Sequence, residues 1–150
     1  MEFRLEKLGP LTLATVTGNG GCDDRERVAQ DTADRLEMML DAQGVECGRR
    51  FFAEMNVGSG IYHAAYAEID VSAAPGGGVR VVRLPNEEFA AIDMPDVDFA
   101  EAQKLAFSGD FRAWMRANGF VQDMSEVLYI CERTEDGFTF YAPIEPRILQ

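Results

Sequence analysis

The order of secondary-structure signals occurs twice in this chain. In each half a β-rich segment precedes a helical pattern, a glycine ends that pattern, and two strand-like runs follow. The first helical pattern ends in Asp-Ala-Gln-Gly at Gly44 and the second in Arg-Ala-Asn-Gly at Gly119. The offset is about 75 residues, half of the 150-residue chain, and a repeated supersecondary unit predicts internal symmetry.

The first half begins with a strand pattern over residues 11–18, LTLATVTG, which is rich in β-branched residues and closed by glycines. Residues 22–44 then have a helical period. Its apolar stripe contains Val28, Thr32, Leu36, Met39 and Leu40. Strand patterns over residues 50–58 and 61–71 follow, joined by Gly58-Ser59-Gly60, which predicts a hairpin.

The second half follows a Gly- and Pro-containing connector at residues 72–78. A helical period over residues 98–119 predicts one long helix, in which Gly109 marks a kink or a break. Asp136-Gly137 is a turn signal between two further strand patterns. The expected strands of this half cover residues 79–84, 88–94, 126–132 and 137–144.

These patterns predict an α+β fold with two strand–helix–hairpin modules related by a pseudo-twofold axis. Each module would have an antiparallel sheet and one long helix, and a ligand cleft would lie between the modules. The length suits one domain over residues 1–150, with module one at about 1–72 and module two at about 79–150.

The charge and the cysteines exclude several function classes. With a formal net charge of −12, we expect no basic surface for direct nucleic-acid binding. The acidic surface either keeps the protein in solution or attracts a basic protein partner. No apolar run has the length of a membrane span. The three cysteines have no CxxC spacing, which favours free thiols in the cytoplasm and no metal site. No Gly-rich motif with phosphate-binding spacing is present, so we expect no cofactor.

The strand pattern IYHAAYAEID contains the first candidate binding residues. Tyr62, Tyr66 and Glu68 share its even-numbered face, while the odd-numbered face, which includes His63, has the composition of core. The even-numbered face is either an ordinary exposed face or the wall of a pocket for a planar cation. His63 is the sole histidine and is expected to be a hydrogen-bonded core residue.

Four further residues are candidates from their positions in the predicted elements. Glu54 lies on the strand face opposite to Phe51 and is either a solvated glutamate or a partly buried carboxylate of the cleft. Trp114 on the second helix belongs either to the core or to the pocket. Tyr129 and Tyr141 lie in the last two strands, where a buried hydroxyl needs a partner.

The segments LPNEEFAAIDMPD, GDFRAWMRANGF and FTFYAPI follow one another in the second half of the chain. Together they resemble the GyrI-like small-molecule-binding family, also described as the AraC-type bacterial effector-binding domain, and the resemblance covers most of the chain. It implies a cleft between two modules that holds flat, apolar and often cationic compounds among aromatic residues and a glutamate. The family's acidic position corresponds to Glu126 or, in another register, to Tyr129, with Glu68 or Glu54 as alternative sources of charge.

The leading hypothesis is therefore a binding protein that senses or sequesters planar or amphipathic cationic compounds. A second hypothesis, implied by the resemblance, is a hydrolase of cyclopropane-type toxins that uses Glu126 and Tyr129. A third is an acidic protein-interaction module with a gyrase or a transcription regulator as partner. The residues alone show no catalytic constellation, which favours binding over catalysis.

Overall fold

The computed structural model describes residues 2–18, 25–57, 60–123 and 127–147. The strands are β1 (Glu2–Leu8), β2 (Leu11–Gly18), β3 (Arg50–Val57), β4 (Gly60–Glu68), β5 (Arg80–Leu84), β6 (Glu87–Pro95), β7 (Phe120–Gln122), β8 (Val127–Arg133) and β9 (Gly137–Pro146). The helices are α1 (Arg25–Ala42), α2 (Phe99–Ala106) and α3 (Gly109–Ala117).

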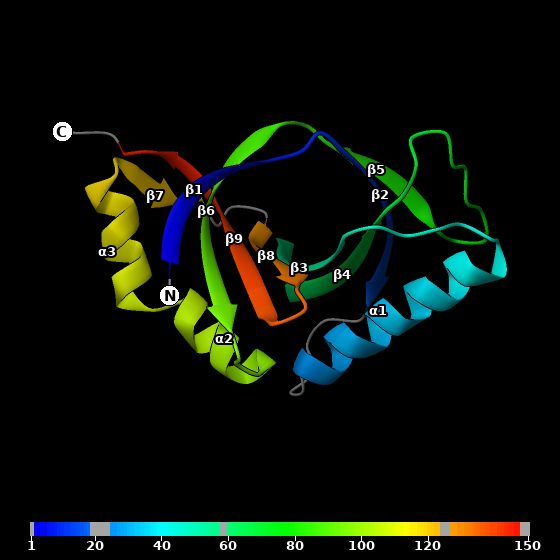
Figure 1. The fold of residues 1–150 in the computed structure, drawn as a ribbon, viewed down its shortest axis with the longest axis horizontal. Coiled ribbons are helices and arrows are strands. Elements are labelled where there is room, and N and C mark those ends of the chain that lie inside the picture. The colour runs from blue at the N-terminus through cyan, green and yellow to red at the C-terminus, as the bar shows by residue number, and fades with distance from the viewer. Residues whose placement is uncertain (1, 19–24, 58–59, 124–126, 148–150) are drawn as a thin grey trace.

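The strands form one continuous, strongly curled antiparallel sheet (Figure 1). Its order is β1-β6-β9-β8-β3-β4-β2-β5, and β7 pairs with β9 outside this path. Each strand of one half has a counterpart in the other: β1 and β5, β2 and β6, β3 and β8, and β4 and β9. When every strand is replaced by its counterpart, the result is the same strand order read from the other end of the sheet. The expected pseudo-twofold relation is therefore present, with its axis between β3 and β8. The expectation of separate sheets is wrong, because β3 and β8 pair and join the halves.

Each edge strand pairs with a strand from the other half of the chain. β1 pairs with β6, with Leu5 opposite Ala90, and β5 pairs with β2, with Val82 opposite Leu13. Local patterns at residues 2–8 do not show whether this first strand pairs within the chain or with another copy. The structure places its partner within the chain, and the non-local pairing explains why local patterns could not decide this.

All three helices of the described residues cover one face of the sheet. Leu36 and Leu40 of α1 pack on Ala65 and Ala67 of β4, the odd-numbered face that was expected to be core. The helices α2 and α3 cover a larger cluster on β6, β8 and β9, which includes Phe140. A third cluster, around residues such as Leu8, Leu13 and Tyr141, occupies the opposite, inner face of the curled sheet.

The second helical segment is divided next to Gly109, where the sequence indicated a kink or a break, and is therefore not one continuous long helix. The side chain of Asp98 caps α2 by accepting a hydrogen bond from the Glu101 amide at 2.9 Å. Ser108 then begins α3 and accepts from the Phe111 amide at 3.4 Å. A serine at this position offers the backbone an alternative to continued helix, which explains the break one residue before Gly109.

The predicted helix stops are confirmed at both glycines. Gly44 has φ 69° and Gly119 has φ 85°, values in the left-handed region that favours glycine. The Gly44 amide donates to the Asp41 carbonyl, and the Gly119 amide donates to the Arg116 carbonyl. The equivalent stops support the internal symmetry that the sequence predicts.

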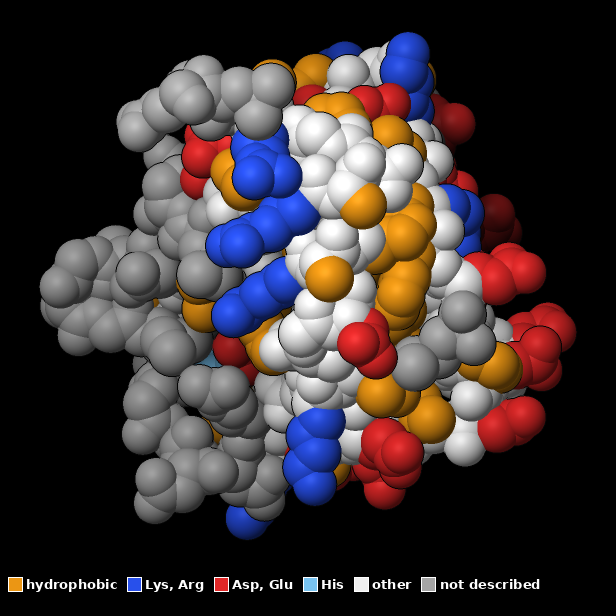
Figure 2. Space-filling model, turned by 90° about the vertical axis from the view of Figure 1, so that its left-hand side faces the viewer, with side chains coloured by type: hydrophobic (Ala, Val, Ile, Leu, Met, Phe, Trp, Pro, Cys, Tyr) orange, Lys and Arg blue, Asp and Glu red, His pale blue; other side chains and the backbone are white. Residues whose placement is uncertain are grey.

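The surface charge is unevenly distributed. Figure 2 shows the side of the molecule on which α3 lies in Figure 1. Lys and Arg side chains gather along one side of an exposed hydrophobic stripe, and Asp and Glu side chains gather along the other. On this face, acidic and basic side chains are therefore separated by the hydrophobic stripe.

Candidate functional site

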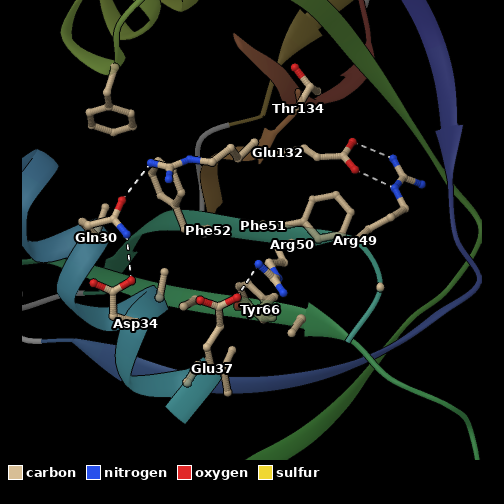
Figure 3. A pocket seen from close by; sticks show the side chains of 18 of the residues that line it. Gln30, Asp34, Glu37, Arg49, Arg50, Phe51, Phe52, Tyr66, Glu132 and Thr134 are labelled. Carbon is tan, nitrogen blue, oxygen red and sulfur yellow. Dashed lines mark hydrogen bonds and ion pairs between the residues drawn. The ribbon is translucent and has the colours of Figure 1, made fainter. Parts of the chain in front are cut away.

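A pocket of about 750 Å³ lies between α1, the first residues of β3, the last residues of β4 and β8, and the start of α2 (Figure 3). A cavity of this size accommodates a ligand of drug-like dimensions. Its charged lining residues are Glu26, Asp34, Glu37, Arg49, Arg50, Glu132, Arg133 and Glu135. Its aromatic lining residues are Phe51, Phe52, Tyr66 and Phe99.

The charged lining favours a cation. It contains five carboxylates and three guanidinium groups, which gives a formal charge of −2. Partly enclosed sites strengthen this preference, because water screens the charges less there than at an open surface.

Aromatic side chains form two walls on opposite faces of the sheet. On the helix-covered face, Phe52 lies with its ring centroid 5.0 Å from that of Phe99, at an angle of 50°. On the inner face, Phe51 and Tyr66 are cross-strand partners in the β3–β4 pair. Because successive residues of a strand point to opposite faces, Phe51 and Phe52 bring both faces to one pocket at the start of β3.

A hydrogen-bonded network fixes the rim on the inner face. Arg49 donates to Glu132 through Nε and Nη2, both at 2.7 Å, and the Tyr141 hydroxyl donates to Glu132 Oε1 at 2.9 Å. Arg49 Nη2 also lies 3.2 Å from the Tyr141 hydroxyl oxygen, and the guanidinium carbon is 5.1 Å from the Phe51 ring centroid. Burial, followed by the nearby Glu132 carboxylate, raises the pKa of Tyr141, so its hydroxyl remains a donor.

Polar contacts connect α1 to the strands across the pocket. Arg133 donates to Gln30 at 2.8 Å, Gln30 donates to Asp34 at 2.8 Å, and Arg50 forms an ion pair with Glu37. Figure 3 shows Gln30, Asp34 and Glu37 on α1 facing Arg50 and the strand ends. The wall formed by α1 is thus positioned by polar contacts at the rim and by apolar packing beneath it.

A second group of polar residues is buried on the helix-covered face, under α2. Glu54 is fully buried, and Gln103 Nε2 donates to its Oε1 at 3.2 Å and to the Tyr129 hydroxyl at 3.1 Å. His63 Nδ1 lies 4.0 Å from Glu54 Oε1. The sequence alternative of a solvated Glu54 is therefore wrong, because α2 covers this part of β3. His63, 2% exposed, is a core residue as expected.

Phe52 separates this buried cluster from the pocket. It lies two residues before Glu54 on the same face of β3, and its ring centroid is 6.4 Å from that of Tyr129. Burial, followed by the charge of Glu54, raises the pKa of Tyr129. The phenol therefore keeps its proton and acts as a hydrogen-bond donor beside the carboxylate.

The structure brings some of the other predicted site residues to the pocket. Tyr66 lines the pocket. Tyr141 is not a lining residue, but its hydroxyl donates a hydrogen bond to the lining residue Glu132. Glu68 accepts a hydrogen bond from the Arg49 amide at 3.3 Å, beside the lining. Tyr62, on the same strand face as Tyr66, is 37% exposed and is not among the lining residues.

The remaining predicted residues lie elsewhere. Trp114 of α3 packs against Phe3 of β1, with ring centroids 5.9 Å apart, and is not among the lining residues of the pocket. Glu126 lies outside the described residues. The roles proposed for these residues stay predictions.

The sequence did not indicate several residues that form the pocket. Arg49 and Glu132 are 83 positions apart, and only the pairing of β3 with β8 brings them together. Gln30, Asp34 and Glu37 have the appearance of an ordinary solvated helix face. Their spacing of three to four residues does place them on one side of α1, which is the one signal the sequence contained.

Neither a metal-binding cluster nor a membrane-crossing helix is found among the described residues. Within that part of the chain, no group of three or more His, Cys, Asp and Glu side chains could hold a metal ion. None of the described helices is long and apolar enough to cross a membrane.

Comparisons with known proteins show the fold. No protein-family model matches the chain, and no curated protein does. Among solved structures, EcmrR in a complex with DNA superposes with a TM-score of 0.72 at 7% identity, covering 98% of this chain and 58% of that one. The present chain thus corresponds to little more than half of that protein.

Two further structures match over nearly their whole lengths. A hydrolase from Listeria innocua has a TM-score of 0.64 at 13% identity, covering 96% of this chain and 92% of that one. SAV2435 bound to tetraphenylphosphonium has a TM-score of 0.57 at 16% identity, covering 97% and 94% respectively. At such low identities the likeness concerns the fold alone.

Proposed function

We propose that this chain is a small-molecule-binding protein of the GyrI-like kind, which senses or sequesters planar or amphipathic cations. The observation that carries the proposal is the pocket of about 750 Å³ with four aromatic lining residues and a lining charge of −2. Aromatic faces attract cations through their quadrupoles, by about 0.5–2 kcal/mol for each contact. Stacking and apolar burial are weakly directional, which suits a site for varied planar compounds.

A relative in fold supports the same ligand class. SAV2435 was solved with tetraphenylphosphonium, a cation surrounded by aromatic rings. The aromatic side chains and carboxylates of the present pocket provide groups that complement such a ligand. Neutral compounds of equal size would gain the stacking but not the electrostatic attraction.

The test is a thermal-shift titration with three planar dyes of matched size, one cationic, one neutral and one anionic. Ligand at about 100 times its Kd stabilises the native state by about 2.7 kcal/mol. For a chain of this length the melting temperature should rise by roughly 5–11 °C. We expect the largest rise for the cationic dye.

Substitutions inside and outside the pocket show whether the dye binds there. Tyr66→Ala and Glu132→Gln should reduce the rise caused by the cationic dye, because one removes a wall and the other a carboxylate of the rim. Glu145→Gln is the matched control, since it removes an exposed carboxylate of β9 outside the pocket. An equal response to all three dyes would contradict the proposed charge preference, and no response to any dye would contradict the binding function.

A second candidate function is hydrolysis of a strained, cyclopropane-type electrophile. The buried contact of Glu54 with Tyr129 favours it, since a carboxylate and a protonated phenol beside a pocket can serve as general base and acid. Phe52 would have to move to admit a substrate to these groups.

Product analysis by mass spectrometry, after incubation with a cyclopropane-bearing alkylating compound, tests this candidate. Loss of a hydrated product in Tyr129→Phe and Glu54→Gln variants that still bind the compound would support catalysis. Binding without any product in the wild-type protein would contradict it.

A further inference from the structure

A second, smaller cavity lies beside the candidate site on the inner face of the sheet. Its volume is about 150 Å³, and its lining is almost entirely apolar, with Leu13, Ala53, Val82 and Ile130 among its residues. Arg83, on the edge strand β5, is the one charged lining residue that the structure describes there. Apolar cavities of roughly this size accept molecules such as benzene.

The two cavities share a boundary. Phe51 and Tyr66, cross-strand partners on the inner face, line both of them. Burial raises the pKa of Tyr66, so this boundary is uncharged at neutral pH.

The chemistry changes in a fixed order along the strands. On β8 the inner-face residues pass from Glu132, in the larger cavity, to Ile130, in the smaller one. On β3 they pass from Phe51, shared by both, to Ala53, in the smaller one. A ligand that follows this face would meet charge, then aromatic rings, then apolar side chains.

We propose that the natural ligand class is a cation with a short uncharged apolar arm. The cationic part lies in the larger cavity, and the arm passes between Phe51 and Tyr66 into the smaller one. This proposal rests on the proposed function and adds to it the shape of the ligand. Because an apolar cavity of about 150 Å³ accepts benzene, a six-carbon molecule, the smaller cavity should hold an arm of roughly five carbons.

The proposal predicts how the affinity of a ligand depends on the length of its arm. Each methylene removed from water contributes a factor of about four in affinity. The gain should stop after about five carbons, when the smaller cavity is full. Longer arms extend into solvent and add little.

The experiment is isothermal titration calorimetry with n-alkyltrimethylammonium ions, from ethyl to octyl, on the full chain. In the wild-type protein, affinity should rise about fourfold per carbon and level off near pentyl. In Ala53→Leu, which fills part of the smaller cavity, the affinity should level off about three carbons earlier, one for each added carbon.

Three controls separate cavity filling from other effects. Ala113→Leu, an exposed position of α3, should leave the profile unchanged. Val82→Phe fills the same cavity from β5 and replaces Ala53→Leu if that variant does not fold. The planar cationic dye, which carries no arm, should bind wild type and the filled variants equally.

A length profile that is flat, or that is the same in the filled variants, would overturn the two-cavity proposal. If the planar dye still binds in that case, the proposed function stands and this inference alone fails. If neither the dye nor any alkylammonium ion binds, both fail.

Discussion

Replacing Tyr129 by phenylalanine should destabilise the protein substantially. Tyr129 is 1% exposed, and its hydroxyl is hydrogen-bonded to Gln103 at 3.1 Å and to Glu54. A hydrogen bond between neutral groups contributes about 1 kcal/mol and one to a charged group about 1.5–3 kcal/mol. The expected loss in the free energy of unfolding is therefore about 2.5–4 kcal/mol, a large part of the roughly 5–15 kcal/mol typical of a domain.

Urea unfolding followed by circular dichroism measures this loss. The melting temperature should also fall, by roughly 5–15 °C. Tyr62→Phe is the matched control, because Tyr62 is 37% exposed and a surface substitution changes stability by less than about 0.5 kcal/mol. An equally small effect in Tyr129→Phe would refute the reasoning that this hydroxyl supports the buried carboxylate.

The pH dependence provides an independent check on Tyr129. Burial raises its pKa in the folded state, whereas an unfolded tyrosine titrates near pH 10. The folded state therefore holds the proton more tightly, so the resulting stability is complete below about pH 10 and is lost as the pH rises above it. The free energy of unfolding should fall above about pH 10 in the wild type, and less steeply in Tyr129→Phe.

Three further substitutions test separate parts of the structure. Glu132→Gln removes one charge of the rim. Because a pocket of this volume has a radius of roughly 6 Å, the binding free energy of a monovalent cation should weaken by about 0.7–3 kcal/mol. Calorimetry at two ionic strengths should show that added salt reduces this loss. Leu36→Ala leaves a cavity between α1 and β4 and should cost about 2–5 kcal/mol in urea unfolding, whereas Met38→Ala at an exposed position should cost little. Ser108→Ala removes the cap of α3 and should cost about 1 kcal/mol in the same assay, and an unchanged midpoint would show that the cap does not hold this helix.

Local patterns were sufficient for most of the secondary structure. The β-branched run of β2, the helical stripe of α1 and the two glycine stops depend on neighbouring residues, and the structure contains each of them. The order of these elements also predicted the pseudo-twofold arrangement. The sequence also indicated a kink or a break at Gly109, and the structure divides the helices there, with Ser108 as the N-cap of α3.

Non-local pairing determined what the sequence could not predict. The partner of β1 is β6, about 80 to 90 residues away, and the two hairpins join into one sheet through β3 and β8. The same pairing brings Arg49 to Glu132 and forms the rim of the pocket. The burial of Glu54 depends on where α2 lies, so strand periodicity could place it on a face but could not show what covers that face.

The most direct test of the central claim is an amide NMR titration of the isotope-labelled protein with the planar cationic dye. The account predicts that chemical-shift changes gather on α1, on the first residues of β3 and on the end of β8 around Glu132, with little change on α3. Saturable changes that gather on α3 and β7 instead, or an absence of saturable changes at any described residue, would contradict the claim that this pocket is the ligand site.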